Sequence, residues 1–308
     1  MLSGPRPAGS NVEMNRVFFL VGPTAVGKSG IAAEVAQRTG AEILSADAFQ
    51  IYRGLDLLTA KPDRATFAKA RHHLIGLVPL DAEMNVEKFR ALAQPILHLG
   101  KPVLVVGGNG FYVKALTHGV ATLPGAHERL REKLEGATSP ELLRSLRALD
   151  PIAAEKIDAQ NRRRVVRAVE VCLLTGKPFS AQKTERKTPA PSNGILLERD
   201  RDELYARINQ RVEQMFKAGV VEEVRAAKDI GSTASQTIGL REIRALIAGE
   251  ISPAECIARI QQATRRYAKR QLTWFRRQTN FPSLNLSAYR PDEAVELISQ
   301  SAARVFRR

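Results

Sequence analysis

An apolar run over residues 17–21 leads directly into a glycine-rich stretch that constrains the fold more than any other feature of the sequence. The stretch matches G-x-x-x-x-G-K-[ST]. Its residues are Gly22, Pro23, Thr24, Ala25, Val26, Gly27, Lys28 and Ser29. A strand that passes through such a loop into a helix binds phosphate, because backbone N–H groups and the positive helix end converge on an anion. Lys28 adds a charge, and the Ser29 hydroxyl can bind Mg²⁺. A nucleoside triphosphate or another diphosphate of similar geometry would satisfy this loop.

Strand-like and helix-like segments alternate along most of the chain. Apolar runs at 17–21, 42–45, 72–78, 101–106 and 195–198 predict strands, and 29–38 and 86–99 predict helices between them. This alternation predicts an α/β fold, a P-loop NTPase-like parallel sheet flanked by helices. Segments that predict only helices are 127–135, 140–149, 151–157 and 162–174, and, after the last predicted strand, 202–218, 220–228, 240–248, 253–279 and 291–306.

These patterns predict three parts of the chain. Residues 1–13 are rich in Gly and Pro and are expected to form a flexible N-terminal extension. Residues 14–118 and 186–308 are expected to form the P-loop α/β core, and residues 119–185 an all-helical insertion domain.

The chain carries a strong positive charge. Lys and Arg total 47 against 32 Asp and Glu, a formal net charge of +15. The excess is concentrated in residues 186–308, and the segment 259–277 holds seven basic residues and no acidic one. A basic helix face is often only solvated, but an acid-free run of this length favours contact with the phosphates of a nucleic acid.

Cysteine content and hydropathy indicate the cellular compartment of the protein. Two cysteines, Cys172 and Cys256, cannot cross-link a chain of 308 residues, which is typical of a reduced, cytoplasmic protein. No apolar run reaches the roughly 18 residues of a membrane span. We expect a cytoplasmic monomer with no membrane association and no obligate protein partner.

Polar residues follow the predicted strands at the sheet edge where ligands of parallel sheets bind. Asp47 follows strand 42–45 and has three possible roles: a Mg²⁺ ligand, a general base or a helix cap. Asn109 follows strand 101–106, Lys61 precedes a proline, and Arg241 lies at a predicted helix start.

Taken together, these segments resemble the tRNA dimethylallyltransferase family, also called tRNA isopentenyltransferases or IPP transferases. The similarity runs from about residue 16 to residue 285. It is carried by residues 22–29, 45–62, 106–116, 161–171, 238–242 and 268–277. The phosphate loop is shared with many kinases, whereas the 45–62 segment, with its D-x-x-x-I-Y-x-G-x-D-x-x-T-A-K-P pattern, is far more specific.

The resemblance implies transfer of a dimethylallyl group from dimethylallyl diphosphate to N6 of adenosine 37, beside the anticodon, in tRNAs that read codons beginning with U. Asp47 would deprotonate N6 as the new bond forms. Lys28, the loop amides, Mg²⁺ and Arg241 would stabilise the departing diphosphate. On this interpretation the loop holds a leaving group, so ATP is not expected to be a substrate even though the motif is of the ATP-binding type.

The resemblance also implies how tRNA is bound. The target adenosine would leave its stack and contact Asp47, Ala48, Phe49 and Gln50. The anticodon stem-loop would contact Gln160, Asn161, Arg162, Arg163 and Arg164 of the insertion. Lys269 and Arg270 would bind phosphates, and Arg131 would assist catalysis. The family usually has Thr at the position of Asn109, where its hydroxyl would orient the reacting groups, and Asn109 keeps a donor and an acceptor on a longer side chain. The family usually has Ser at the position of Ala48, so one hydroxyl contact to base or phosphate would be missing there.

Three other functions remain open at this point. A small-molecule or nucleotide kinase would share the phosphate loop but would not need the basic helices. An isopentenyltransferase that acts on free adenine nucleotides would not need the helical insertion. An RNA-binding protein that uses a nucleotide only as a switch would not need Asp47.

Overall fold

The computed structural model describes residues 16–119, 123–182 and 193–307. The chain divides into two compact units. Met1–Thr117 and Ala190–Arg308 form the first, and His118–Pro189, inserted between them, forms the second. The predicted N-terminal extension, residues 1–13, lies outside the described residues. Within the described residues, no helix has both the length and the apolar character needed to cross a membrane.

A six-stranded parallel sheet organises the first unit, with strand order β3-β2-β4-β1-β5-β6. The strands are β1 Val17–Val21, β2 Glu42–Ser45, β3 His72–His73, β4 Val103–Gly107, β5 Gly194–Glu198 and β6 Ser283–Asn285. All neighbouring pairs are parallel, so the carboxyl ends of the strands share one edge. The central strand β1 lies between β4 and β5, the position where open α/β sheets bind ligands. The predicted fold class is confirmed.

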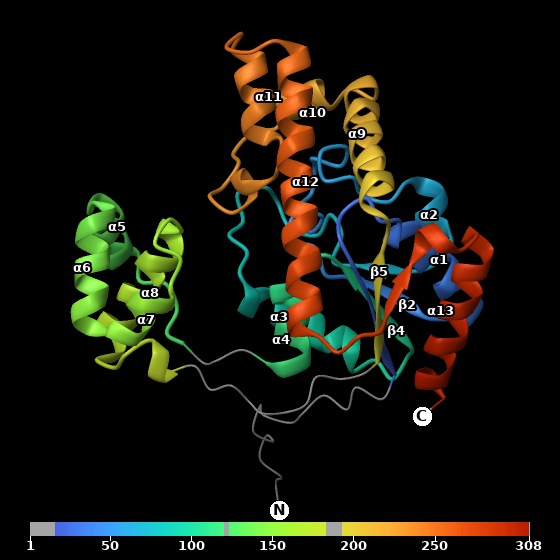
Figure 1. Cartoon of the computed structure of the whole chain (residues 1–308), viewed down its shortest axis with the longest axis horizontal. Helices are drawn as coiled ribbons and strands as arrows, with labels where there is room; N and C mark the ends of the chain where they lie inside the picture. Colours follow the sequence, from blue (N-terminus) through green and yellow to red (C-terminus); the bar gives the residue numbers. More distant parts are fainter. Residues whose placement is uncertain (1–15, 120–122, 183–192, 308) are drawn as a thin grey trace, which may run out of the picture. The chain divides into compact units, whose positions relative to one another are not determined.

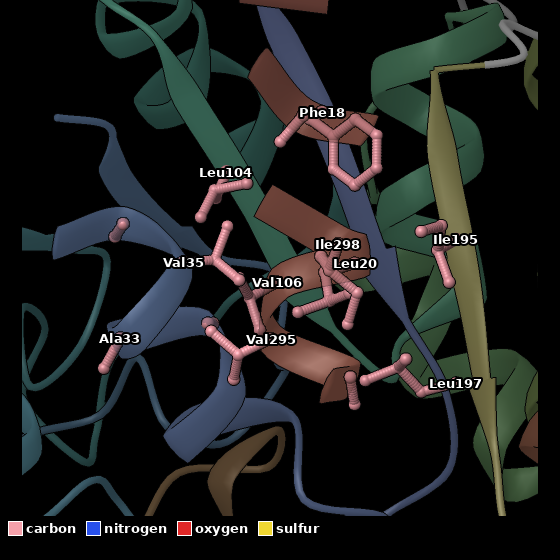
Figure 2. Close-up of a cluster of buried hydrophobic side chains, with 14 of the residues drawn as sticks. Phe18, Leu20, Ala33, Val35, Leu104, Val106, Ile195, Leu197, Val295 and Ile298 are labelled. Atoms are coloured by element: carbon pink, nitrogen blue, oxygen red, sulfur yellow. The ribbon is translucent and has the colours of Figure 1, made fainter. Parts of the chain in front are cut away.

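The two faces of the sheet follow from the alternation of side chains along β1. Phe18 and Leu20 point to one face, where α1 (Lys28–Thr39) and α13 (Pro291–Phe306) cover the sheet. Figure 2 shows this cluster, to which α1 contributes Ala33 and Val35 and α13 contributes Val295 and Ile298. Val17, Phe19 and Val21 point to the other face.

That second face is covered by helices from three parts of the chain. They are α3 (Val86–Leu97), α4 (Gly110–His118) and the C-terminal part of α12 (Pro253–Gln278). The ring of Phe275, on α12, is fully buried there. Figure 1 shows α12 as a long helix that continues well past the sheet.

A group of helices extends beyond the carboxyl edge of the sheet (Figure 1). It contains α9 (Arg201–Lys217), α10 (Val220–Ala226), α11 (Leu240–Ile247) and the N-terminal part of α12, packed around a common apolar cluster. Leu55 and Leu58 are buried in the same cluster. The long loop that follows β2 is therefore anchored to these helices, and α2 (Arg64–Ala68) follows it.

The second unit is a small helical bundle with its own core. Its helices are α5 Glu128–Gly136, α6 Ser139–Leu149, α7 Pro151–Lys156 and α8 Arg162–Thr175. A buried carboxylate, Glu170, accepts hydrogen bonds from Arg131 (2.9 Å), Arg167 (2.8 Å) and the His127 N–H (3.0 Å). Burial alone would raise the pKa of Glu170, but these bonds hold it below its ordinary value.

Most predicted elements lie within one or two residues of the observed ones. The third predicted strand, 72–78, is shorter: β3 covers only His72–His73, and Val78 forms an isolated bridge with Tyr52. The sequence interpretation missed α4, whose Gly-Asn-Gly start resembles a turn, and the short elements α2 and β6.

Candidate active site

The phosphate loop follows β1 and adopts a conformation that glycine makes possible. Gly22 has φ 155°, and a Cβ at this position would lie 2.5 Å from the carbonyl oxygen of Leu197 in β5. Gly27 caps α1 in the left-handed region, with φ 112°. Any side chain at Gly22 would push the loop away from the neighbouring strand.

Basic side chains bind the carbonyl oxygens of this loop. Arg199 donates from Nε to the Val26 oxygen (2.9 Å), and Arg207 donates from Nε to the Ala25 oxygen (3.0 Å). In a trans peptide the C=O and the following N–H point in opposite directions. Holding these two carbonyls therefore turns the next two N–H groups, of Val26 and Gly27, away from the arginines, and so orients the donors of an anion site.

Thr24 is held from two other helices. Its hydroxyl accepts a hydrogen bond from Arg211 of α9 at 3.3 Å. Its N–H donates to Oε1 of Gln271, a buried side chain of α12, at 2.8 Å. Arg211 also donates to the Ala60 carbonyl at 3.2 Å and so joins the phosphate loop to the loop after β2.

Lys28 is the charged residue of the phosphate loop, residues 22–29. Its ammonium donates to the carbonyl oxygens of Gly22 (2.9 Å) and Pro23 (2.7 Å). Burial lowers the pKa of Lys28 from 10.5 to about 7; the Asp47 carboxylate opposes this shift, and Arg211 adds to it. At neutral pH part of the lysine is thus deprotonated, and an anion bound beside it would favour the charged form.

This lowered pKa predicts how the binding of inorganic diphosphate depends on pH. Below pH 7 Lys28 is already protonated. Above pH 7 Lys28 must take up a proton from the solvent when the anion binds. The affinity of the wild type relative to that of Lys28→Met should therefore fall as the pH rises above 7, by at most about tenfold per pH unit for one linked proton. Isothermal titration at pH 8, in buffers of different ionisation enthalpy, should show nearly one more proton taken up by the wild type than by Lys28→Met. Equal proton uptake would contradict this prediction; the ligand's own titration cancels in the comparison.

Asp47 lies just beyond the end of β2. Its Oδ1 accepts hydrogen bonds from the N–H groups of Phe49 (2.9 Å) and Gln50 (3.2 Å), which fixes the carboxylate at the start of a turn. The helix-cap interpretation of the sequence is wrong, because the residues after Asp47 form a turn, and the carboxylate caps that turn instead. The same side chain also lines the cavity described below, where it lies within electrostatic range of Lys28 and Arg211.

The loop after β2 is held in place by several of its own and neighbouring side chains. Gln50 donates to the Ala60 carbonyl at 3.1 Å and accepts from Ser45 at 3.2 Å. Lys61 pairs with Asp56 at 2.5 Å. Glu223 of α10 accepts hydrogen bonds from the backbone N–H groups of Leu57 (2.8 Å) and Leu58 (2.9 Å). These contacts fix the segment that carries Asp47 and Gln50.

The end of β4 approaches this loop closely. A Cβ on Gly107 would lie 2.2 Å from the carbonyl oxygen of Ala46, so only glycine fits there. The next polar residue, Asn109, uses its Oδ1 to accept the N–H groups of Phe111 (3.0 Å) and Tyr112 (3.2 Å) at the start of α4. Its backbone N–H donates to Ala46 at 3.3 Å, beside Asp47.

A cavity of about 440 Å³ opens at this edge of the sheet. Its lining combines the phosphate loop, the loop after β2, α9 and α12, with four basic side chains and two carboxylates. Those side chains are Lys28, Lys61, Arg207, Arg211, Asp47 and Asp63. The Ser29 hydroxyl and the Asp47 carboxylate share the cavity, and hydroxyl, carboxylate and phosphate oxygens are the ligands that Mg²⁺ prefers, so this lining fits the ion.

The structure places the other predicted site residues in three locations. Arg241 starts α11 with a side chain that is 90% exposed, is paired with Glu242 at 2.9 Å, and does not line the cavity. Lys269 and Arg270 lie on the exposed face of α12, and the Arg270 guanidinium lies 5.8 Å from the ring centre of Tyr267, which does line it. Ala48 and Phe49 are partly buried beside Asp47.

The remaining predicted residues belong to the second unit. Arg131 is paired there with Glu170. Arg162 donates to the carbonyls of Glu135 (2.7 Å) and Ala137 (2.5 Å) and thereby joins α8 to the end of α5. Gln160, Asn161, Arg163 and Arg164 are exposed. Arg162 thus has a structural role that its position in a basic run does not reveal.

Sequence reasoning missed several polar residues of the cavity, among them Arg207, Arg211, Tyr267 and Gln271. The two arginines could have been found from the sequence. They lie one turn apart on the helix that follows the strand beside the phosphate loop, so both can face the loop. Tyr267 and Gln271 lie one turn apart inside the basic segment 259–277. The sequence interpretation of that segment rested on its charged residues. Their position depends on packing between segments that are distant in the sequence.

The fold and the site together define a phosphate-loop α/β protein with an anion cavity beside a carboxylate and a long basic helix. The family comparisons agree with this class. The family model described as IPP transferase matches residues 50–278, and the one described as isopentenyl transferase matches residues 15–78. The chain belongs to the IPP transferase family.

Relatives of known name support this membership. A tRNA dimethylallyltransferase of Geobacter metallireducens is 42% identical, over 86% of this chain and 91% of its own. Another, from Acetivibrio thermocellus, is 40% identical, over 92% of this chain and 95% of its own.

Solved structures give the same result. The full-length tRNA isopentenylpyrophosphate transferase of Bacillus halodurans superposes with a TM-score of 0.69 at 33% identity, covering 95% of this chain and 97% of its own. The tRNA isopentenylpyrophosphate transferase of Staphylococcus epidermidis has a TM-score of 0.67 at 30% identity, over 94% and 98% of the two chains.

Proposed function

We propose that this protein transfers a dimethylallyl group from dimethylallyl diphosphate to N6 of adenosine 37 in tRNAs that read codons beginning with U, as a monomer in the cytoplasm. The observation that carries the proposal is the position of Asp47 in one cavity with the phosphate loop, Arg207 and Arg211. A base for the nucleophile and a cationic site for a leaving diphosphate are the two groups that this transfer needs.

The residues have complementary roles in the proposed reaction. The Asp47 carboxylate accepts the proton from N6 as the bond between N6 and the allylic carbon forms. The bond from that carbon to the diphosphate oxygen breaks, and the negative charge of the leaving group is met by Lys28, Arg207 and Arg211. Mg²⁺ would be held by the Ser29 hydroxyl and would supply further positive charge to the diphosphate.

The basic surface of the first unit fits a folded RNA beside this cavity. Lys269 and Arg270 are exposed on α12, and Arg270 lies against Tyr267 at the cavity wall. An adenine that leaves its stack could enter the cavity while the neighbouring phosphates bind the helix. This juxtaposition favours a tRNA acceptor over a free nucleotide and over the acceptors of a kinase.

A prenylation assay tests the proposal. The protein is incubated with Mg²⁺, dimethylallyl diphosphate and an anticodon stem-loop that carries A36-A37-A38, and nucleosides are analysed by mass spectrometry. We expect N6-dimethylallyladenosine with the stem-loop and none with free AMP. Absence of the product, or transfer of phosphate from labelled ATP to an acceptor, would reject the proposal.

The exposed arginines of α8 lead to a salt-dependence prediction. Arg162 is only partly exposed, whereas Arg163 and Arg164 are both exposed at the N-terminus of α8, where RNA phosphates can reach them. Replacing both by Ala should reduce the slope of log K against log salt for stem-loop binding by about 0.7–0.9 for each RNA phosphate that the two arginines neutralise. Fluorescence anisotropy at several salt concentrations measures the slope, with Arg144→Ala as control. An unchanged slope would assign these arginines to a solvated face.

A further inference from the structure

Gln271 bridges the two strands that diverge at the active site. Val21 of β1 and Gly107 of β4 are the last paired residues before these strands separate. Just beyond them, Oε1 of Gln271 accepts the Thr24 N–H at 2.8 Å, and Nε2 donates to the Gly108 carbonyl at 2.8 Å. The side chain is 6% exposed. Its amide thus replaces a backbone peptide and extends the β1–β4 pairing past the last ladder residues.

The two bonded segments carry the two halves of the proposed reaction. Thr24 belongs to the phosphate loop, which would hold the leaving diphosphate. Gly108 adjoins Gly107, which contacts Ala46 so closely that a Cβ would lie 2.2 Å from the Ala46 oxygen. Ala46 immediately precedes Asp47. The Gln271 amide therefore spans the distance between the site of the leaving group and the base.

The Gln271 amide is closely packed as well as hydrogen-bonded. A Cβ on Gly108 would lie 2.2 Å from Nε2 of Gln271, so Gly108 makes room for the amide. On the buried face of α12, Ala268 and Phe275 lie on either side of it in the sequence and pack into the two main clusters. The helix that carries Gln271 is thus fixed at both ends of this contact.

We propose that Gln271 is a positioning residue that sets the separation between the diphosphate site and Asp47, and so controls the rate of transfer rather than the binding of either substrate. The inference rests on the proposed function. In a displacement reaction the nucleophile, the carbon and the leaving group must be aligned, and a misplacement of about 1 Å can reduce the rate about 10²-fold.

Two substitutions separate the hydrogen bonds from the shape. Gln271→Met fills the same space without donor or acceptor and should lower the single-turnover rate by about 10²-fold. The affinities for the stem-loop and for inorganic diphosphate should each stay within about threefold of wild type, because the loss appears only in the transition state. Gln261→Met, on the same helix, is the matched control; Gln261 makes only 3.4–3.5 Å contacts with α9.

Gln271→Glu adds a readout that a purely structural role would not change. An ionised carboxylate cannot donate to the Gly108 carbonyl, whereas a protonated carboxyl has one donor and one acceptor, like the amide. The charged and titratable groups lining the same cavity are Lys28, Asp47, Lys61, Asp63, His72, Arg207, Arg211 and Tyr267. Since all of them are shared with the wild type, the rate ratio of Gln271→Glu to wild type should rise as the pH falls, while the ratio for Gln271→Met stays flat.

The outcomes are distinguishable from a failure of the proposed function. Product formed by the wild type establishes prenyl transfer independently of any variant. The positioning role is overturned if Gln271→Met keeps the wild-type rate, if diphosphate affinity falls in proportion to the rate, or if the ratio for Gln271→Glu does not change with pH. Should Gln271→Met fail to fold, the pH profile of Gln271→Glu decides the question.

Discussion

Replacing Asp47 with Asn will slow prenyl transfer by about 10²–10⁴-fold while leaving stem-loop binding close to that of the wild type. The Asn side-chain oxygen can still accept the Phe49 and Gln50 N–H groups, so the turn at the end of β2 is preserved. The amide cannot take a proton from N6, and loss of a general base typically costs 10²–10⁴-fold, so we expect a rate reduction of about that size.

Single-turnover product formation and fluorescence anisotropy of the stem-loop measure the two effects separately. Asp292→Asn, in the first turn of α13, is a control for the same chemical change away from the cavity. A parallel loss of binding and product would show that Asp47 acts as an RNA contact and not as the base. If Asp47→Asn keeps the full rate, Asp47 is not the base, and its role is limited to the hydrogen bonds that it accepts from the turn after β2.

The second large effect is expected at Arg211. This side chain contacts Thr24 in the phosphate loop and Ala60 in the loop after β2, and burial lowers its pKa, with Asp47 opposing and Arg207 adding to the shift. Arg211→Gln removes a charge that would face the leaving diphosphate. Because loss of one donor to developing negative charge costs about 10²–10³-fold, kcat should fall by about that factor.

Steady-state kinetics with dimethylallyl diphosphate test this expectation. Arg211→Lys keeps the charge but cannot contact both loops at once, so its kcat should lie between those of Arg211→Gln and the wild type. Arg225→Gln, an exposed residue of α10 paired with Glu222 at 3.3 Å, is the matched control. A raised KM with unchanged kcat would mean that Arg211 binds the donor equally in the ground and transition states.

Local sequence patterns were sufficient for strands β1, β2, β4 and β5 and for the ligand edge of the sheet, whereas β3 is shorter than predicted and β6 was missed. The apolar runs of β1 and β2 and the helical pattern of α13 are encoded in short segments, and their observed bounds match the predicted ones. The position of Asp47 beside the phosphate loop followed from the parallel arrangement of the strands. The start of α4 was missed because Asn109 caps it from within a glycine-rich turn, a role that only the backbone geometry reveals.

Long-range contacts explain what the sequence could not show. Gln271 meets Thr24 only after α12 packs on the sheet, and no local periodicity marks such a pairing. Arg162 lies in a basic run that predicts phosphate contact, yet its guanidinium binds carbonyls at the end of α5. Charge patterning identifies basic surfaces but does not say which of their side chains are already used within the fold.

The phosphate loop also has a consequence for protein design. The carbonyls of Ala25 and Val26 are bound by Arg207 and Arg199, and the Thr24 N–H is bound by Gln271, all from outside the motif. The eight loop residues grafted onto another strand and helix would therefore lack the partners that orient their peptide groups. A functional transplant of this anion site would need the two arginines and the glutamine as part of the transferred unit.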